Sequence, residues 1–359
     1  MITWGISANS HDAALAVFTK EGLEFASHSE RFSGLKNDPH LNDKIIDYAL
    51  QWGEADEVIW YENPFKKSIR QIYAGQGFNF NKNSTRRYLG SYGIHAPVFN
   101  ISHHHSHAAA GYYTSPFSEA TVLCIDSIGE FETLTIWQGK RDQLKKIYSQ
   151  KFPHSIGLWY SAMTQRIGLT ANEDEYILMG MAAYGDSRVY RNQIMHDFFE
   201  SKTLPIKFKH NLHRGCNWWR PELNDDHNFN IAAGTQWVYE TILDNILQWC
   251  KQNTDSKNLV IMGGCALNCS ANHLAYKYFD DVWIMPNPGD AGSAIGSVLA
   301  YKKEHLPMPN MYMGYNIEGE YPVEEAISEL KKTGIAGVAN GRAEFGPRAF
   351  GNRSLLADP

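Results

Sequence analysis

Short apolar stretches that alternate with polar turns fill the N-terminal part of the chain, and the same pattern returns further along. Each block has a strand, an acid-bearing turn, a second strand, a glycine turn and a third strand. In the first block the strands cover 2–7, 13–18 and 23–28, with the acid-bearing turn at 8–12; in the second they begin at 120, with that turn at 126–130. We interpret the two blocks as an internal duplication.

Each block is followed by helical sequence, at 41–52 after the first and at 155–168 and 232–253 after the second. Two lobes, each a three-stranded meander extended by a βα unit, are typical of the duplicated α/β fold of actin, hexokinase and the heat-shock ATPases. In that fold the first hairpin of each lobe faces the cleft where nucleotide phosphates bind. Ser127 and Gly129 are therefore candidates for phosphate contacts, although acidic residues are also common in ordinary hairpin turns.

Four histidines lie in the stretch His103-His104-His105-Ser106-His107, which is followed by three alanines. Ser102 is a favourable N-cap and alanine is the best helix former, so the sequence predicts a helix that begins here. His103 and His107 then lie at i and i+4 on one face, with Cβ atoms about 6 Å apart. Two imidazoles so placed can share one metal ion. A histidine-rich turn used for capping and surface hydrogen bonds is the alternative interpretation.

Two carboxylates complete the expected metal site. Asp126 follows the strand at 120–125, and Asp290 follows the strand at 282–285, where we expect it to N-cap a helix of small residues. Both are expected to face the cleft, so that with His103 and His107 they offer two nitrogens and two oxygens. This mixed donor set suits Fe(II), Zn, Mn or Co.

A glycine-rich turn follows the buried strand at 259–262. It contains Gly263, Gly264 and Asn268 and leads into a helix start of small residues. Backbone N–H groups in such a turn can cradle a phosphate or an adenosine.

The C-terminal part begins with an expected linker at 307–319, which is rich in glycine and proline and includes Pro309. A helix at 322–332 and a strand at 336–340 follow. Arg342, Arg348 and Arg353 then alternate with glycines and a proline, a pattern that suits phosphate or carboxylate; a solvated basic loop is the alternative. The expected domains are 1–306, with lobes at about 1–118 and 119–306, and the beginning of a second domain at 320–359. Because the sequence stops at Pro359, directly behind this motif, we expect a fragment or one half of a split protein.

The composition and net charge narrow the class of protein. The chain has 359 residues, 43% hydrophobic and 20% charged, and its net charge of −6 argues against a general nucleic-acid or membrane-surface binder. Five cysteines, an odd number without a paired spacing, suggest reduced thiols and a cytoplasmic location. The sequence shows no N-terminal signal pattern, and none of its apolar runs approaches about 18 residues.

Taken in order, these blocks resemble the NodU/CmcH family of O-carbamoyltransferases, which includes tobramycin carbamoyltransferase, over nearly the whole chain. The matching residues are His11-Asp12, Glu30-Arg31-Phe32 with Lys36, His103-His104 with His107, Asp126 with Gly129-Glu130, Glu175-Tyr176 with Met179-Gly180, Gly263-Gly264 with Leu267-Asn268, Gly289-Asp290, and the arginine-rich block Gly341–Ser354. The last block is the most specific.

The resemblance implies a transferase with two domains, the second of them YrdC-like. Such enzymes turn carbamoyl phosphate and ATP, with Mg, into carbamoyl-adenylate and pass the carbamoyl group to a hydroxyl. The resemblance further implies iron on His103, His107, Asp126 and Asp290, and His11 as general base. The implied contacts to carbamoyl phosphate or nucleotide are Lys36, Ser127, Gly129, Gly264, Asn268, Gly289, Arg342 and Arg348.

Three departures from the family pattern affect these expectations. Ser127 replaces a glycine, Ile177 replaces a lysine, and most of the YrdC-like domain lies outside the sequence, so the missing C-terminal half is an expected partner. The acceptor is expected to be a sugar, a nucleoside or a natural product. The alternatives are a tRNA threonylcarbamoyl-type transferase, which predicts a basic groove, and a truncated module that binds nucleotide and metal without catalysis.

Overall fold

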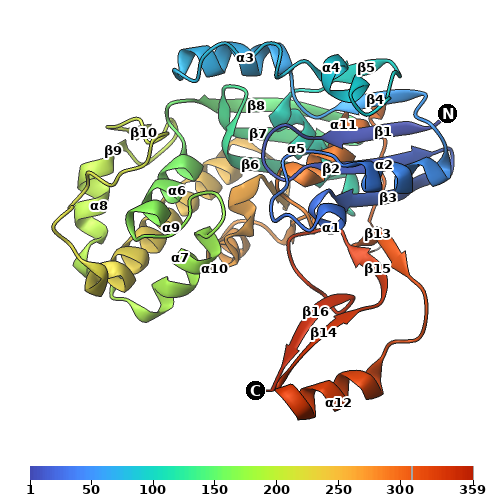
Figure 1. Cartoon of the computed structure of the whole chain (residues 1–359). Coiled ribbons are helices and arrows are strands. Elements are labelled where there is room, and N and C mark those ends of the chain that lie inside the picture. The colour runs from blue at the N-terminus through green and yellow to red at the C-terminus, as the bar shows by residue number, and fades with distance from the viewer. Residues whose placement is uncertain (309, 359) are drawn as a thin grey trace. The chain divides into compact units, whose positions relative to one another are not determined.

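The computed structural model describes residues 1–308 and 310–358. Pro309, in the expected linker, and Pro359, at the end of the expected C-terminal domain, lie outside the described residues. The chain divides into two compact units: the first combines Met1–Ser115 with Met285–Pro359, and the second is Pro116–Ile284. Each unit holds one five-stranded sheet (Figure 1).

The sheet of the first unit has the order β3-β2-β1-β4-β5. Its antiparallel meander consists of β1 (Thr3–Ser7), β2 (Ala14–Thr19) and β3 (Gly22–His28), and β4 (Glu57–Trp60) and β5 (Val98–Asn100) run parallel to β1. All residues of β1 are buried, which is typical of a strand covered on both faces.

Alternate residues of β1 contact different helices. Trp4 and Ile6 share a core with residues of α2 (Asp43–Ala49) and α4 (Thr85–Gly90). On the other face, a Cβ on Gly5 would lie 1.9 Å from the Ala294 carbonyl oxygen of α11 (Ser293–Lys302). Position 5 therefore requires glycine, because a side chain would push α11 away from the sheet.

The second unit has the sheet order β12-β11-β6-β7-β8. Its antiparallel meander consists of β6 (Glu119–Gly129), β7 (Glu132–Lys140) and β8 (Gln143–Lys151), and β11 (Asn258–Met262) and β12 (Asp281–Trp283) are parallel to β6. Each sheet is thus a meander extended by two parallel strands beside its first strand. This shared plan confirms the predicted duplicated α/β fold.

Helices α6 (Ile156–Arg166) and α9 (Asn228–Asn253) contribute to the core beside the second sheet. The segment between them contains α7 (Glu175–Met181), η2 (Ala182–Tyr184), η3 (Ser187–Val189), α8 (Arg191–Phe198), β9 (Phe199–Ser201), β10 (Lys207–Phe208) and η4 (Asp225–His227). After β11 come η5 (Gly264–Leu267), α10 (Cys269–Asn272) and η6 (His273–Lys277). Within the described part of the chain, no helix is both long enough and apolar enough to cross a membrane.

The remaining elements belong to the first unit. They are α1 (Glu30–Ser33), η1 (Leu50–Trp52), α3 (Pro64–Tyr73), α5 (His103–Thr114), η7 (Asp290–Gly292), β13 (Tyr312–Ile317), α12 (Val323–Thr333), β14 (Ile335–Ala339), β15 (Gly341–Glu344) and β16 (Arg353–Ala357). α12 and β14 confirm the helix and strand predicted at 322–332 and 336–340. β14 pairs with β16, and β13 pairs with β15.

The structure differs from the sequence-based expectation at three places. β6 continues through 126–129, which the sequence assigns to a turn, because its pairing with β7 resumes after an irregular stretch, with Gly129 opposite Glu132. β13 lies inside the expected linker because it pairs with a strand further along the chain. Residues 285–306, assigned to the second lobe, belong to the first unit because α11 packs against α5 and β1.

Candidate metal and transfer site

Helix α5 presents two buried histidines one turn apart. It begins at His103 as predicted, with Ser102 at the N-cap, although the Ser102 side chain makes no capping hydrogen bond. His103 and His107 are 2% and 0% exposed, and their Nε2 atoms lie 3.1 Å apart. This burial excludes the interpretation as a histidine-rich surface turn.

Asp290 brings a carboxylate to the same point. Its Oδ1 atom lies 3.4 Å from Nε2 of His103 and 3.3 Å from Nε2 of His107, so the three donor atoms form a nearly equilateral triangle. Tetrahedral ligands about 2.0–2.1 Å from an ion are about 3.3–3.4 Å apart, and neighbouring octahedral ligands are about 3.0 Å apart. The observed separations therefore fit one ion bound to all three residues.

The sequence predicts that Asp290 N-caps α11, but in the structure it does not. It begins the short helix η7, and Gly292 occupies the N-cap position of α11. Gly292 approaches Asn287 so closely that a Cβ at position 292 would lie 1.9 Å from the Asn287 carbonyl oxygen. This tight turn precedes α11, and Asp290 is therefore available to the histidines instead of the helix start.

Small residues bring α5 and α11 into backbone contact. A Cβ on Gly296 of α11 would lie 2.0 Å from the Ser106 carbonyl oxygen and 2.6 Å from the Cβ of Ala110 in α5. At the start of α11, Ser293 Oγ lies 3.3 Å from Nδ1 of His107. Donation of the Nδ1 proton to this hydroxyl leaves the Nε2 lone pair of His107 for a metal ion.

The acid-bearing turn of the first unit holds His11 and Asp12. Nδ1 of His11 lies 3.2 Å from Oδ2 of Asp12, and the His11 side chain is 41% exposed. Burial acts to raise the pKa of Asp12, but the hydrogen bond with His11 and nearby positive charge, including that of Lys36, outweigh it, so this pKa lies below its usual value. An ionised Asp12 that accepts the Nδ1 proton leaves Nε2 of His11 as a proton acceptor.

Lys36, Arg342 and Arg348, the predicted carbamoyl phosphate contacts of the first unit, differ in exposure and in their hydrogen-bond partners. Lys36 is 74% exposed, with its Nζ 3.9 Å from Oε2 of Glu30. Arg342 donates to three backbone carbonyls, one in β3 and two in β13, at 2.6–3.3 Å. Arg342 therefore ties β15 to these strands, whereas Arg348 is an exposed residue of the loop that follows.

In the second unit, Asp126 meets the predicted glycine turn. The N–H of Gly264 donates to Oδ1 of Asp126 at 3.3 Å, and a Cβ on Gly263 would lie 2.2 Å from a carbonyl oxygen of β6. Ser127 lies in the stretch of β6 where the register against β7 is interrupted, and Gly129 lies where the pairing resumes, opposite Glu132. The structure thus brings Asp126 to the glycine turn, while the two histidines and Asp290 belong to the first unit.

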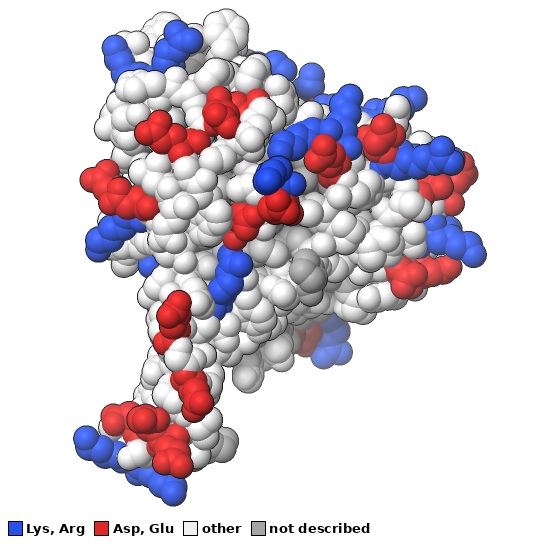
Figure 2. All heavy atoms as spheres, turned by 90° about the vertical axis from the view of Figure 1, so that its right-hand side faces the viewer, with Lys and Arg blue, Asp and Glu red and all other residues white. Residues whose placement is uncertain are grey.

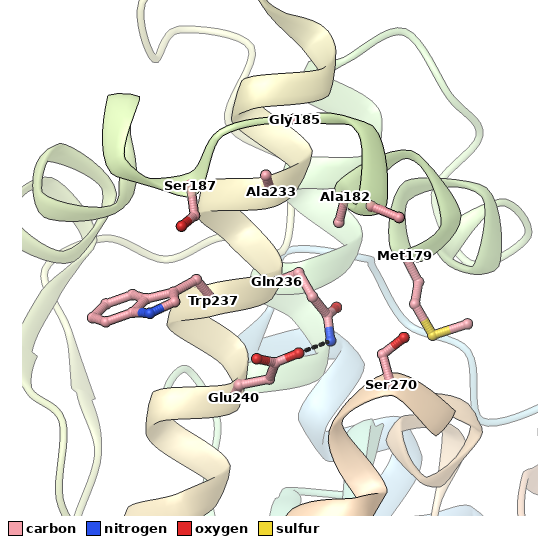
Figure 3. A pocket seen from close by; sticks show the side chains of 10 residues that line it. Met179, Ala182, Gly185, Ser187, Ala233, Gln236, Trp237, Glu240 and Ser270 are labelled. Atoms are coloured by element: carbon pink, nitrogen blue, oxygen red, sulfur yellow. Dashed lines mark hydrogen bonds between the residues drawn. The ribbon is translucent and has the colours of Figure 1, made fainter.

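Asn268 forms a buried amide pair with Gln236 of α9. The two side chains exchange two hydrogen bonds of 2.9 Å, and Gln236 also donates to Glu240 at 3.0 Å. Gln236 and Glu240 line a pocket of about 280 Å³, opposite Met179 and Ser270 (Figure 3). Among the described residues that line it there is a carboxylate, Glu240, but no lysine or arginine, so the pocket does not suit an anionic group and can bind hydroxyls.

Comparison with known proteins gives the family. The family model described as carbamoyltransferase N-terminus matches residues 92–299, and the one described as carbamoyltransferase C-terminus matches residues 327–359. The chain belongs to the carbamoyltransferase family.

Relatives of this carbamoyltransferase are longer than the chain. An uncharacterized protein of Synechocystis sp. is 30% identical, over 99% of this chain and 71% of its own length. Nodulation protein NolNO of Sinorhizobium fredii is 26% identical, over 97% and 58%. The 3'-hydroxymethylcephem-O-carbamoyltransferase of Amycolatopsis lactamdurans is 24% identical, over 97% and 72%. Component A of (R)-2-hydroxyglutaryl-CoA dehydratase from Acidaminococcus fermentans, a crystal structure, has a TM-score of 0.48 and 13% identity, over 84% of this chain and 98% of that one.

Sequence reasoning missed buried residues that lie in the same unit as three of the predicted ligands. His28 and Asn287, which are hydrogen-bonded and buried, are 259 positions apart in the sequence, and Ser293 reaches His107 from another helix. Only His28 carries a signal that could have identified it, because a histidine at the end of an apolar strand, directly before Ser-Glu-Arg, is an unusual buried residue.

The charge distribution bears on the tRNA-modifying alternative. On the face of the carbamoyltransferase that Figure 2 shows, acidic and basic side chains are interspersed, and the described residues form no extended basic area there. This agrees with the net charge of −6. That face therefore gives no support to a groove for nucleic acid.

Proposed function

We propose that this chain carries the transfer site of an O-carbamoyltransferase, which moves a carbamoyl group from carbamoyl phosphate, through an ATP-derived carbamoyl-adenylate, to a hydroxyl. The observation that carries the proposal is the buried donor triangle of His103, His107 and Asp290 in the same unit as the His11–Asp12 pair. Family membership supplies the reaction class. The relative from Amycolatopsis lactamdurans is named for O-carbamoylation of a 3'-hydroxymethylcephem, which supports a hydroxyl acceptor.

We assign His103, His107, Asp290 and Asp126 as the ligands of one Fe(II) ion. Imidazole nitrogens with carboxylate oxygens form a mixed donor set that this ion accepts. Asp126 is supported by its family motif and by the Gly264 N–H, which orients the carboxylate. When bound, the ion would polarise the carbamoyl oxygen as a Lewis acid.

His11 is the general base of the proposed reaction, and Asp12 positions it. The acceptor oxygen attacks the carbamoyl carbon while its proton passes to Nε2 of His11. The bond from that carbon to the adenylate oxygen breaks, and AMP leaves with the electron pair. Asp12 holds the Nδ1 proton and stabilises the imidazolium that forms.

Charged and polar groups of both units provide the proposed substrate contacts. Lys36 and Arg348 would neutralise phosphate charge, and Arg342 supports the loop that carries Arg348. The pocket beside α9 would take the uncharged part of the acceptor or the adenosine, because its carboxylate, amide and hydroxyl groups can bind hydroxyls. The nucleotide, supplied as ATP with Mg, would contact Ser127, Gly129, Gly264, Asn268 and Gly289. A cytoplasmic location is supported by five free cysteines.

The experiment measures carbamoyl transfer directly. Anaerobically purified protein loaded with Fe(II) is incubated with isotope-labelled carbamoyl phosphate, ATP, Mg²⁺ and a panel of sugar, nucleoside and natural-product alcohols. A parallel reaction supplies the C-terminal part of the Synechocystis relative in trans. We expect a carbamate ester of one acceptor class, detected by mass spectrometry and lost in His11→Ala. Metal-loaded protein that forms no carbamate ester in either reaction would refute the proposal.

A further inference from the structure

The loop before Asp290 is fixed to strand β3 by a buried hydrogen bond. Nδ2 of Asn287 donates to Nε2 of His28, the last residue of β3, at 2.8 Å. Each of the two residues is only 3% exposed. Burial lowers the pKa of His28, so its ring is neutral and can accept this hydrogen bond.

Two residues of the C-terminal motif pack beside this hydrogen bond. Phe345 contacts His28, and Gly346 contacts Pro286, the residue before Asn287. Phe345 is fully buried, and its ring centroid lies 5.4 Å from that of His28. Gly346 packs so closely on the loop that a Cβ there would lie 2.7 Å from the Pro286 carbonyl oxygen. The Gly346 carbonyl oxygen in turn accepts a hydrogen bond of 3.3 Å from Nη2 of Arg31. Phe345 and Gly346 therefore pack against β3 and against the residue before Asn287.

The loop connects Asn287 to Asp290 through a tight turn. The N–H of Gly292 donates to the Gly289 carbonyl oxygen at 3.1 Å, and Gly292 leaves no room for a Cβ beside the Asn287 carbonyl oxygen. Asn287 and η7 consequently form one tight turn. Because Asp290 lies within this turn, a displacement of Asn287 would also displace the Asp290 carboxylate from the two histidines.

We propose that His28, Asn287, Phe345 and Gly346 form a clasp that positions Asp290 for metal binding, so that the C-terminal segment sets the affinity of the metal site. These are positioning residues, because they act through Asp290. The inference rests on the ligands named in the proposed function. It gives the Phe345-Gly346 part of the C-terminal motif a role separate from phosphate binding.

The test compares the wild type with Gly346→Ala, Asn287→Leu and His28→Gln. Co(II) is the probe, because its visible absorption reports the number and geometry of its ligands. Gly337→Ala is the matched control: it lies in β14 of the same C-terminal segment, and its nearest neighbour would be 3.8 Å from the added Cβ. Titration gives the Kd and the spectrum of the Co(II) complex, and thermal unfolding without metal gives the stability of each variant.

We expect Gly346→Ala and Asn287→Leu to weaken Co(II) binding by about 10- to 100-fold, the usual effect of losing an outer-shell partner, and to change the spectrum. His28→Gln should keep most of the affinity, because the Gln Oε1 atom can accept the Asn287 hydrogen bond. Gly337→Ala should match the wild type. If either Gly346→Ala or Asn287→Leu fails to fold, the Co(II) affinity and spectrum of the other variant decide the test.

The outcomes separate the clasp from the proposed function. Wild-type affinity and spectrum in Gly346→Ala and Asn287→Leu, even with reduced stability, would show that the clasp only supports the fold and would overturn the inference. A wild-type protein that binds no Co(II) would instead overturn the ligand assignment itself, and the clasp with it.

Discussion

Replacing Gly296 with alanine tests whether the metal ligands depend on the backbone contact between α5 and α11. The added Cβ would lie 2.0 Å from the Ser106 carbonyl oxygen and 2.8 Å from the backbone nitrogen of Ala110. Cβ atoms essentially never approach other atoms more closely than 3.0 Å. The contact at Ser106 must therefore lengthen by about 1 Å, and because the obstacles are backbone atoms, one helix must move.

This movement should reduce both stability and metal affinity. Overpacking of a close contact costs roughly 1–3 kcal/mol. In a domain of this size each 1 kcal/mol lowers Tm by about 2–4 °C, so we expect a decrease of about 2–12 °C. Metal–ligand distances tolerate only about 0.2 Å, so a helix displacement of about 1 Å would separate His103 and His107 from Asp290.

Thermal unfolding of the metal-free protein and titration with Co(II) measure the two effects. Gly90→Ala is the matched control, because Gly90 also lies in a helix of the first unit and has no described neighbour within 4 Å of the added Cβ. This control should be neutral or slightly stabilising, since alanine favours helix more than glycine does. Wild-type Tm and wild-type Co(II) affinity in Gly296→Ala would refute the reasoning.

Three further predictions concern single groups. The double variant His103→Ala with His107→Ala should lose its metal in elemental analysis after anaerobic purification, because two of the three triangle donors are gone; one metal per chain in that variant would contradict the ligand assignment. His11→Ala should abolish carbamoyl transfer and leave Co(II) binding unchanged, whereas loss of both would mean that His11 also supports the metal site. Glu344 is 2% exposed and accepts hydrogen bonds from the backbone N–H groups of Phe350 and Asn352; burial raises its pKa, but these bonds outweigh it and the pKa lies below its usual value. The resulting stability is present above the pKa of the unfolded state and is lost as pH falls through the lower pKa of the folded state. Glu344→Gln should therefore reduce the fall in unfolding free energy on acidification, measured by urea titration, and an unchanged fall would contradict this role.

Local sequence signals predicted the elements that carry the histidines. β1, β2 and β3 follow the apolar stretches and polar turns of the sequence, and α5 begins at the residue after Ser102. These features depend on neighbouring residues alone, so the sequence contains their determinants. The spacing of His103 and His107 also predicted correctly that their side chains meet, since i and i+4 share a helix face.

Features set by distant contacts were beyond sequence reasoning. The sequence around Asp290 is typical of a helix N-cap. Only the structure, in which Gly292 packs on Asn287, shows that the Asp290 carboxylate lies beside the two histidines instead. The arginine-rich loop suggested anion binding, yet the acceptors of Arg342 are carbonyls of β3 and β13. The type of a residue shows which hydrogen-bond partners or ligands its side chain can bind, and the tertiary fold determines which of these lie within reach.

The first unit combines two segments from opposite ends of the chain, whereas the second unit is one continuous segment, 116–284. On the ribosome, the second unit is therefore complete before Asp290 and α11 have been translated. The face of α5 that α11 will cover stays open until residues 293–302 emerge, and Phe345 and Gly346 follow later still. The nascent protein thus acquires a finished metal-binding geometry only after both segments of the first unit have been translated.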